Sequence, residues 1–193
     1  MRIPLALLTV LATLNCACTI VAYRPIEPER KPTTVETQDK KEFLSFFYHS
    51  GALLNPTEEL QSLPWEFQLL KDLFEHHSRF LKAIVTPSPP VTGTHINSYR
   101  TVVSSTSPWC ATSFVTLSII PCYTEGIVSQ VHFDVYVDNA LKQSYRYEIS
   151  RKSANWIGLI PFIWINAFTT HRKDAFAAIA YQFLSDGQRD GYF

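Results

Sequence analysis

The spacing of hydrophobic residues predicts two or three short helices between residues 40 and 78. Asp39–Glu42 has the capping pattern of a helix start, with an aspartate followed three residues later by a glutamate. The phenylalanines that follow fall on one helical face: Phe43, Phe46 and Phe47. Asn55–Glu58 restarts a helix with proline at its first position, and the stretch from Trp65 to His77 carries a wide apolar stripe.

The middle of the chain changes to the alternating pattern of β-strands. Five segments show it: residues 81–85, 94–105, 112–120, 128–138 and 143–150. The segment 94–105 has mixed polarity, which predicts an edge strand. Residues 128–138 alternate most regularly, which predicts that Val131, Phe133, Val135 and Val137 face the core. Asp138–Asn139 interrupts the pattern, so we expect an antiparallel meander of about four to five strands with one solvated face.

A final helix is predicted to begin near Thr170, with Gly187 at the place of a helix-ending glycine. Short N-terminal helices, then strands, then one C-terminal helix define an α+β fold. The expected organisation is a single α+β domain over residues 42–193.

Residues 156–168, WIGLIPFIWINAF, are almost entirely apolar and contain Pro161. As a helix they would reach roughly 20 Å, less than the approximately 30 Å core of a bilayer. Burial in the core is the preferred interpretation. The alternative is contact with a membrane or a partner, for which tryptophan suits an interface. The residues that would make this contact are Trp156, Ile157, Leu159, Phe162 and Trp164.

The N-terminus combines a positive start, Met1-Arg2, with an apolar run that ends in small residues and two cysteines, Cys16 and Cys18. A run of about a dozen residues is typical of a signal peptide and too short to span a membrane. A thiolate is the nucleophile suited to thioether formation. If Cys18 is the cysteine that is modified, the residue before it is the small Ala17. If Cys16 is modified instead, the residue before it is Asn15, so Cys18 is the preferred site of modification.

This pattern resembles the lipobox of bacterial lipoproteins, in which the cysteine receives a diacylglyceryl group before cleavage. The resemblance implies a signal peptide over residues 1–17 and lipidation of Cys18. Thr19 follows the acceptor without the aspartate that commonly retains lipoproteins in the inner membrane, which implies the outer membrane, facing the periplasm. Residues 18–41 contain Pro25, Pro28 and Pro32 among polar neighbours, so we expect a flexible tether there.

Composition excludes some classes of function. Lys and Arg number 17, as do Asp and Glu, so there is no basic footprint for nucleic acid. With 6 glycines in the chain, we find no glycine-rich phosphate loop and predict no cofactor. The mature chain is long enough to bury a real core.

Histidines are the candidates for chemistry, and none is predicted to perform it. His76 and His77 are adjacent and point about 100° apart on a helix, so they cannot both ligate one ion well. His132 and Asp134 share the outward face of one strand, but no serine stands in a nucleophile-elbow context. We therefore expect no catalytic and no metal-ligating residues, and a protein that is not an enzyme.

Cys110 and Cys122 are the remaining cysteine pair in an oxidising compartment, which favours a disulfide. A continuous strand over residues 112–120 excludes that bond. It would hold the two α-carbons roughly 40 Å apart, whereas a disulfide requires about 7 Å or less. The strand is the preferred interpretation of the two.

Residues 110–170 also resemble a broad group of small uncharacterised bacterial lipoproteins. The resemblance rests on TLSIIPCYTEG, VHFDVYVDN and WIGLIPFIWIN, and it implies no activity. The expected function is a lipid-anchored, non-enzymatic envelope protein that contacts the membrane through its lipid and another envelope component through its sheet or apolar segment. The alternative is a carrier or sensor of a small apolar ligand held between helices and sheet. A hydrolase built around His132 is a weaker third.

Overall fold

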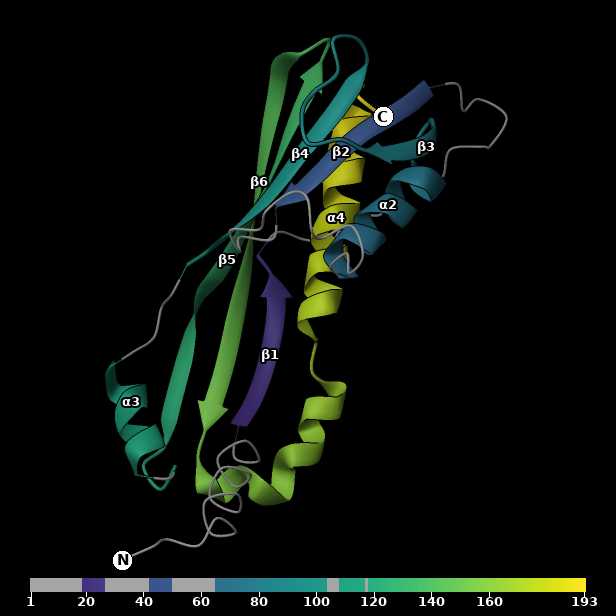
Figure 1. The fold of residues 1–193 in the computed structure, drawn as a ribbon. Helices are drawn as coiled ribbons and strands as arrows, with labels where there is room; N and C mark the ends of the chain where they lie inside the picture. Colours follow the sequence, from purple (N-terminus) through teal and green to yellow (C-terminus); the bar gives the residue numbers. More distant parts are fainter. Residues whose placement is uncertain (1–18, 27–41, 50–64, 104–107, 117) are drawn as a thin grey trace, which may run out of the picture. The chain divides into compact units, whose positions relative to one another are not determined.

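The structure, a computed structural model, describes residues 19–26, 42–49, 65–103, 108–116 and 118–193. Within these ranges, six strands form one mixed sheet with the order β1-β6-β5-β4-β2-β3 (Figure 1). The elements are β1 (Thr19–Pro25), β2 (Glu42–His49), α2 (Trp65–His77), β3 (Phe80–Val85), β4 (Thr94–Val102), α3 (Pro108–Val115), β5 (Cys122–Val137), β6 (Ala140–Asn155), the 3-10 helix η2 (Ile157–Phe168) and α4 (Arg172–Arg189). The α+β class and the C-terminal helix are confirmed.

The chain divides into two compact units, each assembled from three separate stretches. Unit 1 comprises residues 1–24, 104–128 and 150–172, and unit 2 comprises residues 25–103, 129–149 and 173–193. The long strands β5 and β6 contribute residues to both units. This division differs from the predicted single domain over residues 42–193, since unit 1 also includes most of β1, ahead of residue 42.

Strand β1 corrects the predicted tether. Residues 19–25 were expected to form part of a flexible segment over 18–41, and they form an edge strand beside β6. Their sequence, TIVAYRP, is rich in residues that fit a pleated surface, and this outweighs the prolines and charges that follow. The predicted signal peptide, Cys18 and residues 27–41 lie outside the described residues.

Strand β2 occupies the place of the first predicted helix. Leu44, Phe46 and Tyr48 are buried in alternation, while Phe43 is exposed, so the period is that of a strand. Phenylalanines at positions 43, 46 and 47 also fit one face of a helix, which explains the wrong prediction. The helix predicted to restart at residues 55–58 lies outside the described residues, whereas α2 is confirmed.

The sheet is only partly the predicted antiparallel meander. Strand β4 pairs with β5 in antiparallel register, but β2 runs parallel to both β3 and β4. Strand β4 is therefore central, and the prediction of an edge strand there is wrong. Its mixed polarity arises because one face meets the core through Ile96 while the other carries polar side chains such as Asn97.

Strands β5 and β6 form the predicted hairpin, with Asp138 and Asn139 at the turn. Both residues have positive φ, 51° and 61°, as a two-residue hairpin turn of type I′ requires. The inward prediction is confirmed by burial for Val131, Phe133 and Val135, while Val137 is only half-buried. Tyr145, Tyr147 and Ile149 of β6 are also buried.

Aromatic rings fill the core of unit 2, between the sheet and the helices α2 and α4. Phe133 of β5 stacks on Phe183 of α4 with ring centroids 4.2 Å apart. Phe46 of β2 stacks on Phe67 of α2 at 4.8 Å. These stacks explain why one face of the sheet is apolar and why the helices pack against it.

Helix α3 replaces the strand predicted over residues 112–120, and the prediction that Cys110 and Cys122 stay unbonded is wrong. The two cysteines form a disulfide, with α-carbons 5.2 Å apart. Ser118 allows this, because it adopts a positive φ of 62° and its backbone N–H donates to the Ser113 carbonyl oxygen at 2.7 Å. The sequence offers no glycine for this reversal, so the β-branched pattern was misleading.

Helix α4 continues through Gly187 to Arg189, so the prediction that Gly187 ends it is wrong. Gly191, with φ of 84°, provides the left-handed conformation beyond the helix. Gly187 is required for a different reason. A β-carbon at this position would lie 2.1 Å from the ring of Phe193, which packs over it.

Candidate contact surface

Segment η2 presents apolar side chains to the solvent. None of its residues is buried, and the exposed fractions are 47 % for Phe162, 60 % for Trp164 and 81 % for Phe168. Of the predicted contact residues, Trp156, Ile157, Phe162 and Trp164 are exposed, and Leu159 is half-buried. The preferred prediction of core burial for residues 156–168 is therefore wrong, and the alternative, contact with a membrane or a partner, stays a prediction.

The local conformation of this segment is unusual. Pro161 lies inside η2 and offers no backbone N–H, and the segment coils as a 3-10 helix over 12 residues, whereas such helices are rarely longer than about four residues. Trp156 precedes it in an extended conformation, and its indole packs over Gly158, where a β-carbon would meet the ring at 2.5 Å. A continuous exposed apolar stretch is typical of a surface that contacts lipid or another protein.

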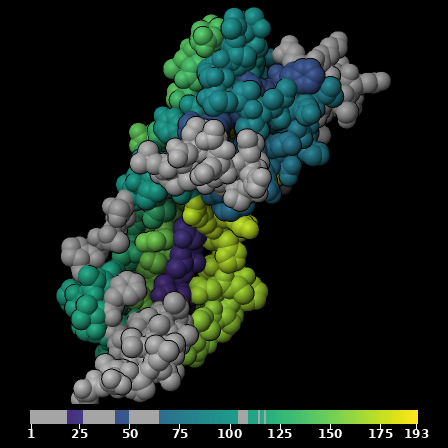
Figure 2. All heavy atoms as spheres, in the orientation of Figure 1, coloured from purple at the N-terminus to yellow at the C-terminus, as the bar shows by residue number. Residues whose placement is uncertain are grey.

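Asn166 fastens η2 to the beginning of β1. Its side-chain Nδ2 donates to the Thr19 carbonyl oxygen at 2.8 Å, and its Oδ1 accepts from the Val21 backbone N–H at 3.1 Å. Figure 2 shows η2 (yellow-green) lying beside β1 (purple) at the surface of the molecule. The exposed apolar segment is therefore held to the residue that directly follows Cys18.

Asn155 joins α3 to the same place. Its Oδ1 accepts from the Ser118 hydroxyl at 2.9 Å and from the Thr19 hydroxyl at 3.3 Å, while its Nδ2 donates to the Ser113 hydroxyl at 3.4 Å. Asn155, Ser113 and Ser118 are all buried. Thr19 is thus held by two asparagines, one at each end of the apolar segment.

Helix α3 and the turn after it add further exposed apolar side chains to unit 1: Trp109, Val115 and Ile119. The backbone N–H of Ile157 donates to the Ser118 carbonyl oxygen at 2.8 Å, so this turn lies directly against the start of η2. Sequence reasoning missed Val115 and Ile119 because it placed 112–120 in a strand, and it gave Trp109 no role. The exposed apolar residues of η2, α3 and this turn together form what we call the apolar surface.

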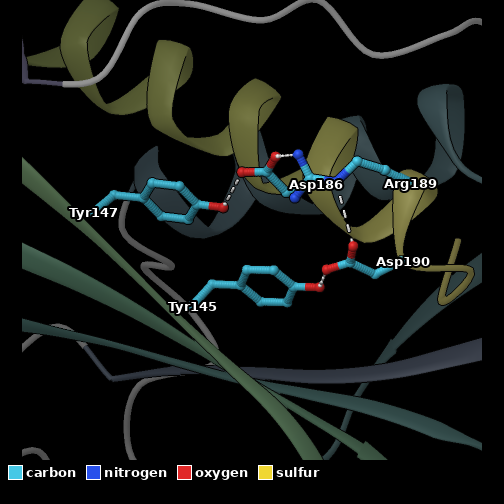
Figure 3. A network of polar contacts seen from close by, with 5 residues as sticks. All are labelled: Tyr145, Tyr147, Asp186, Arg189 and Asp190. Carbon is cyan, nitrogen blue, oxygen red and sulfur yellow. Dashed lines mark hydrogen bonds and ion pairs between the residues drawn. The ribbon is translucent and has the colours of Figure 1, made fainter.

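A second cluster, in unit 2, joins β6 to α4 (Figure 3). The Tyr145 hydroxyl donates to Asp190 at 2.6 Å, the Tyr147 hydroxyl donates to Asp186 at 2.9 Å, and Arg189 forms ion pairs with both carboxylates. Burial raises the pKa of Tyr145, and the hydrogen bond from Tyr145 to Asp190 raises it further. The same hydrogen bond lowers the pKa of Asp190. Since the phenols and carboxylates bind one another, the cluster fastens a helix to a strand.

The side chain of His132 packs against an aromatic ring in unit 2. Its ring stacks face to face on Tyr99 with centroids 4.6 Å apart. Burial and then the charge of Arg146 lower its pKa, and the opposing effect of Asp134 is smaller. Asp134 accepts a hydrogen bond from Ser144. The pair considered from the sequence is therefore occupied by other contacts in unit 2.

His95 has a serine within hydrogen-bond distance, a contact that sequence reasoning missed. Its Nδ1 lies 2.9 Å from the Ser45 hydroxyl oxygen, and this hydroxyl donates its proton to the Thr94 carbonyl oxygen. Both side chains are buried, and burial lowers the pKa of His95. The strand register pairs residues 45 and 95 directly across β2 and β4. A serine that donates to a backbone carbonyl inside a sheet is typical of structural hydrogen bonding.

Among the described residues, no group of three or more His, Cys, Asp or Glu side chains could hold a metal ion, and His76 instead contacts the Asp72 carbonyl oxygen. No helix in the described part of the chain is long and apolar enough to cross a bilayer. Models of known protein families and the sequences of curated proteins give no match to this chain.

Proposed function

We propose that this chain is a non-enzymatic lipoprotein of the bacterial envelope that lies against its membrane through the apolar surface. Cys18 carries the lipid, and the outer membrane, on its periplasmic side, is the proposed location. The observation that supports this most directly is the double hydrogen bond from Asn166 to the backbone of Thr19 and Val21. It fixes exposed aromatic side chains next to the residue that follows the acceptor cysteine.

This arrangement differs from the tethered domain expected at first. A strand that begins at Thr19 leaves no spacer between an acylated Cys18 and unit 1. Acyl chains on Cys18 would therefore enter the bilayer beside η2, whose tryptophans suit the region between water and hydrocarbon. Exposed apolar side chains that would be unfavourable in water are stabilised there.

The disulfide between Cys110 and Cys122 supports an oxidising compartment such as the periplasm. It also joins α3 to the start of β5, and so it holds in place the part of the apolar surface that α3 carries. This bond is independent of the N-terminal pattern, which makes it a second argument for export.

A carrier of apolar ligands is the alternative function, and the core of unit 2 gives it little support. The space between helices and sheet is filled by ring contacts, including Phe133 on Phe183 at 4.2 Å and Phe74 against Phe46 at 5.5 Å. An apolar ligand would have to displace these rings. Contact through an exposed surface requires no such displacement.

Fluorescence quenching tests the proposal on the full-length, lipidated protein. One variant keeps Trp164 alone and a matched variant keeps Trp65 alone, with the other tryptophans replaced by phenylalanine. Trp65 contacts Phe176 and Lys173 within unit 2. In vesicles of phosphatidylcholine with brominated acyl chains, Trp164 should be strongly quenched and Trp65 much less. Equal fluorescence of Trp164 with and without bromine would contradict membrane contact.

The anchor has its own test. Cys18→Ala should remove lipid labelling and leave the protein as an unprocessed precursor or in the soluble periplasmic fraction. Three acyl chains exceed the two signals that stable attachment requires, so the wild-type protein should stay with the membrane fraction. Loss of attachment in Cys16→Ala instead would identify the other cysteine as the acceptor.

A further inference from the structure

Unit 1 is positively charged although the whole chain is neutral. Its three stretches, without the predicted signal peptide, contain four cationic side chains and one carboxylate, a net charge of +3 with histidine neutral. The cations are Arg24, Arg151, Lys152 and Arg172. The carboxylate is Glu125, which forms an ion pair with Lys152 at 2.7 Å. The rest of the chain supplies the compensating negative charge.

Two hydrogen bonds bring these cations to one level of unit 1. The Ser150 hydroxyl donates to the Arg24 carbonyl oxygen at 3.1 Å, which places Arg24 beside the start of the Arg151–Lys152 pair. The Tyr23 backbone N–H donates to the Thr170 carbonyl oxygen at 3.0 Å, so Arg172 follows close by. We call this group the basic level. It lies at the end of β1, five residues from Thr19.

The spacing along β1 suits a bilayer surface. Five residues of strand span about 17 Å, so the basic level is held roughly that far from Thr19. Interfacial apolar segments enter the boundary between headgroups and acyl chains by about 5–10 Å. When the apolar surface enters the bilayer to this depth, the cations of the basic level lie within about one Debye length of the lipid phosphates, where electrostatic attraction is still effective.

We infer that unit 1 recognises anionic phospholipids, with the apolar surface in the interface and the basic level facing the headgroup charge. This inference rests on the proposed membrane contact and adds the lipid class that the contact prefers. Its arguments are the charge of unit 1 and the continuity of the apolar surface with the residue after the lipid acceptor. Each basic residue near an anionic surface should raise the ratio of docked to undocked protein about fivefold.

The experiment uses the lipidated Trp164-only protein in brominated vesicles of two compositions, phosphatidylcholine alone and phosphatidylcholine with phosphatidylglycerol. Quenching should be greater with phosphatidylglycerol, and 0.5 M salt should remove the difference by shortening the Debye length to about 4–5 Å. Salt acts on the unmodified surface, so this measurement does not depend on a variant that folds.

A charge variant and its control identify the residues. Arg24→Gln, Lys152→Gln and Arg172→Gln together should abolish the response to phosphatidylglycerol while leaving the quenching in phosphatidylcholine. The control removes three cations from unit 2, Lys71→Gln, Lys82→Gln and Lys142→Gln, and should keep the response. Two outcomes would overturn the lipid preference and leave membrane contact intact. One is equal quenching of the unmodified surface in the two lipid compositions, and the other is an equal loss of the response to phosphatidylglycerol in the charge variant and its control. No quenching in either lipid would overturn both proposals.

Discussion

Asn166 and Thr19, separated by 147 residues in the chain, are joined by a hydrogen bond of 2.8 Å from the asparagine side chain to the threonine carbonyl oxygen. The bond connects a surface segment to an edge strand that pairs with one neighbour, β6, in the sheet. An edge strand leaves one row of backbone groups unpaired. Asn166 occupies part of that row, because it also accepts the Val21 N–H.

Replacing Asn166 should therefore loosen β1 as well as η2. Asn166→Ala leaves a carbonyl oxygen and an N–H without partners in a partly buried place, and we expect a loss of about 1–3 kcal/mol in the free energy of unfolding. Denaturant unfolding measures the loss, and hydrogen exchange at the Val21 amide should quicken. The matched control is Asn97→Ala, since the Oδ1 of Asn97 accepts no hydrogen bond. Equal losses in the two variants would mean that Asn166 does not hold β1.

The disulfide gives a second prediction. Neither Cys110 nor Cys122 should react with an alkylating reagent in the oxidised protein, and both should react after reduction. Cys110→Ser should lower the stability by roughly 3 kcal/mol, as expected for a closed loop of this length. Cys122→Ser, and the double variant, should cost about the same, because either change removes the same bond. Free reactivity of both thiols without reductant would restore the strand prediction for residues 112–120.

How far the sequence predicts this molecule depends on whether local pattern or distant contact determines each element. Alternation identified β5 because one of its faces is buried and the other solvated, and a helical stripe identified α2 and α4 for the same reason. The pattern failed at β2, where phenylalanines spaced for a helix are held in the sheet by the neighbours β3 and β4. The pattern also failed at α3, where the disulfide between Cys110 and Cys122 outweighs the strand propensity of the sequence.

The candidate surface was predictable in part. The apolar character of residues 156–168 is visible in the sequence, but exposure is not, because a buried strand has the same composition. Its attachment to Thr19 through Asn166 joins residues far apart in the chain, and a single asparagine carries no signal of its partner. The basic level could not be found either, since its cations come from three separate stretches.

Acidification should destabilise unit 2 through His95. Burial lowers the pKa of His95 in the folded protein below its ordinary value of 6.5, so the unfolded chain binds the proton first as the pH falls. Stability is then constant above about pH 7 and decreases below about pH 6.5, by up to about 1.4 kcal/mol per pH unit for this group. The lowered pKa of Asp190 acts in a separate range, below about pH 4.

Unfolding midpoints between pH 7.5 and 5 measure this effect. His95→Gln should flatten the profile, leaving a smaller slope from His132, whose pKa is also lowered. His49→Gln serves as the control, because His49 is exposed at the end of β2. A profile for His95→Gln that still matches the wild-type slope would show that another group causes the dependence.

Whether Gly187→Ala raises or lowers the free energy of unfolding should depend on one other residue, Phe193. Alanine favours a helix interior over glycine by about 1 kcal/mol, so Gly187→Ala would stabilise an isolated α4. In this protein the new β-carbon would lie 2.1 Å from the Phe193 ring, which also contacts Phe183 at 5.2 Å. Because the ring is buried and must move, we expect a net loss of about 1–3 kcal/mol.

Removing the ring should reverse the sign. In a Phe193→Ala background the obstruction is absent, and Gly187→Ala should then raise the free energy of unfolding by up to about 1 kcal/mol through helix propensity alone. The four proteins form a double-mutant cycle, measured by denaturant unfolding, in which the coupling between the two positions should be large. Additive effects would show that Phe193 does not rest on Gly187. The glycine would then have no packing role at the end of α4.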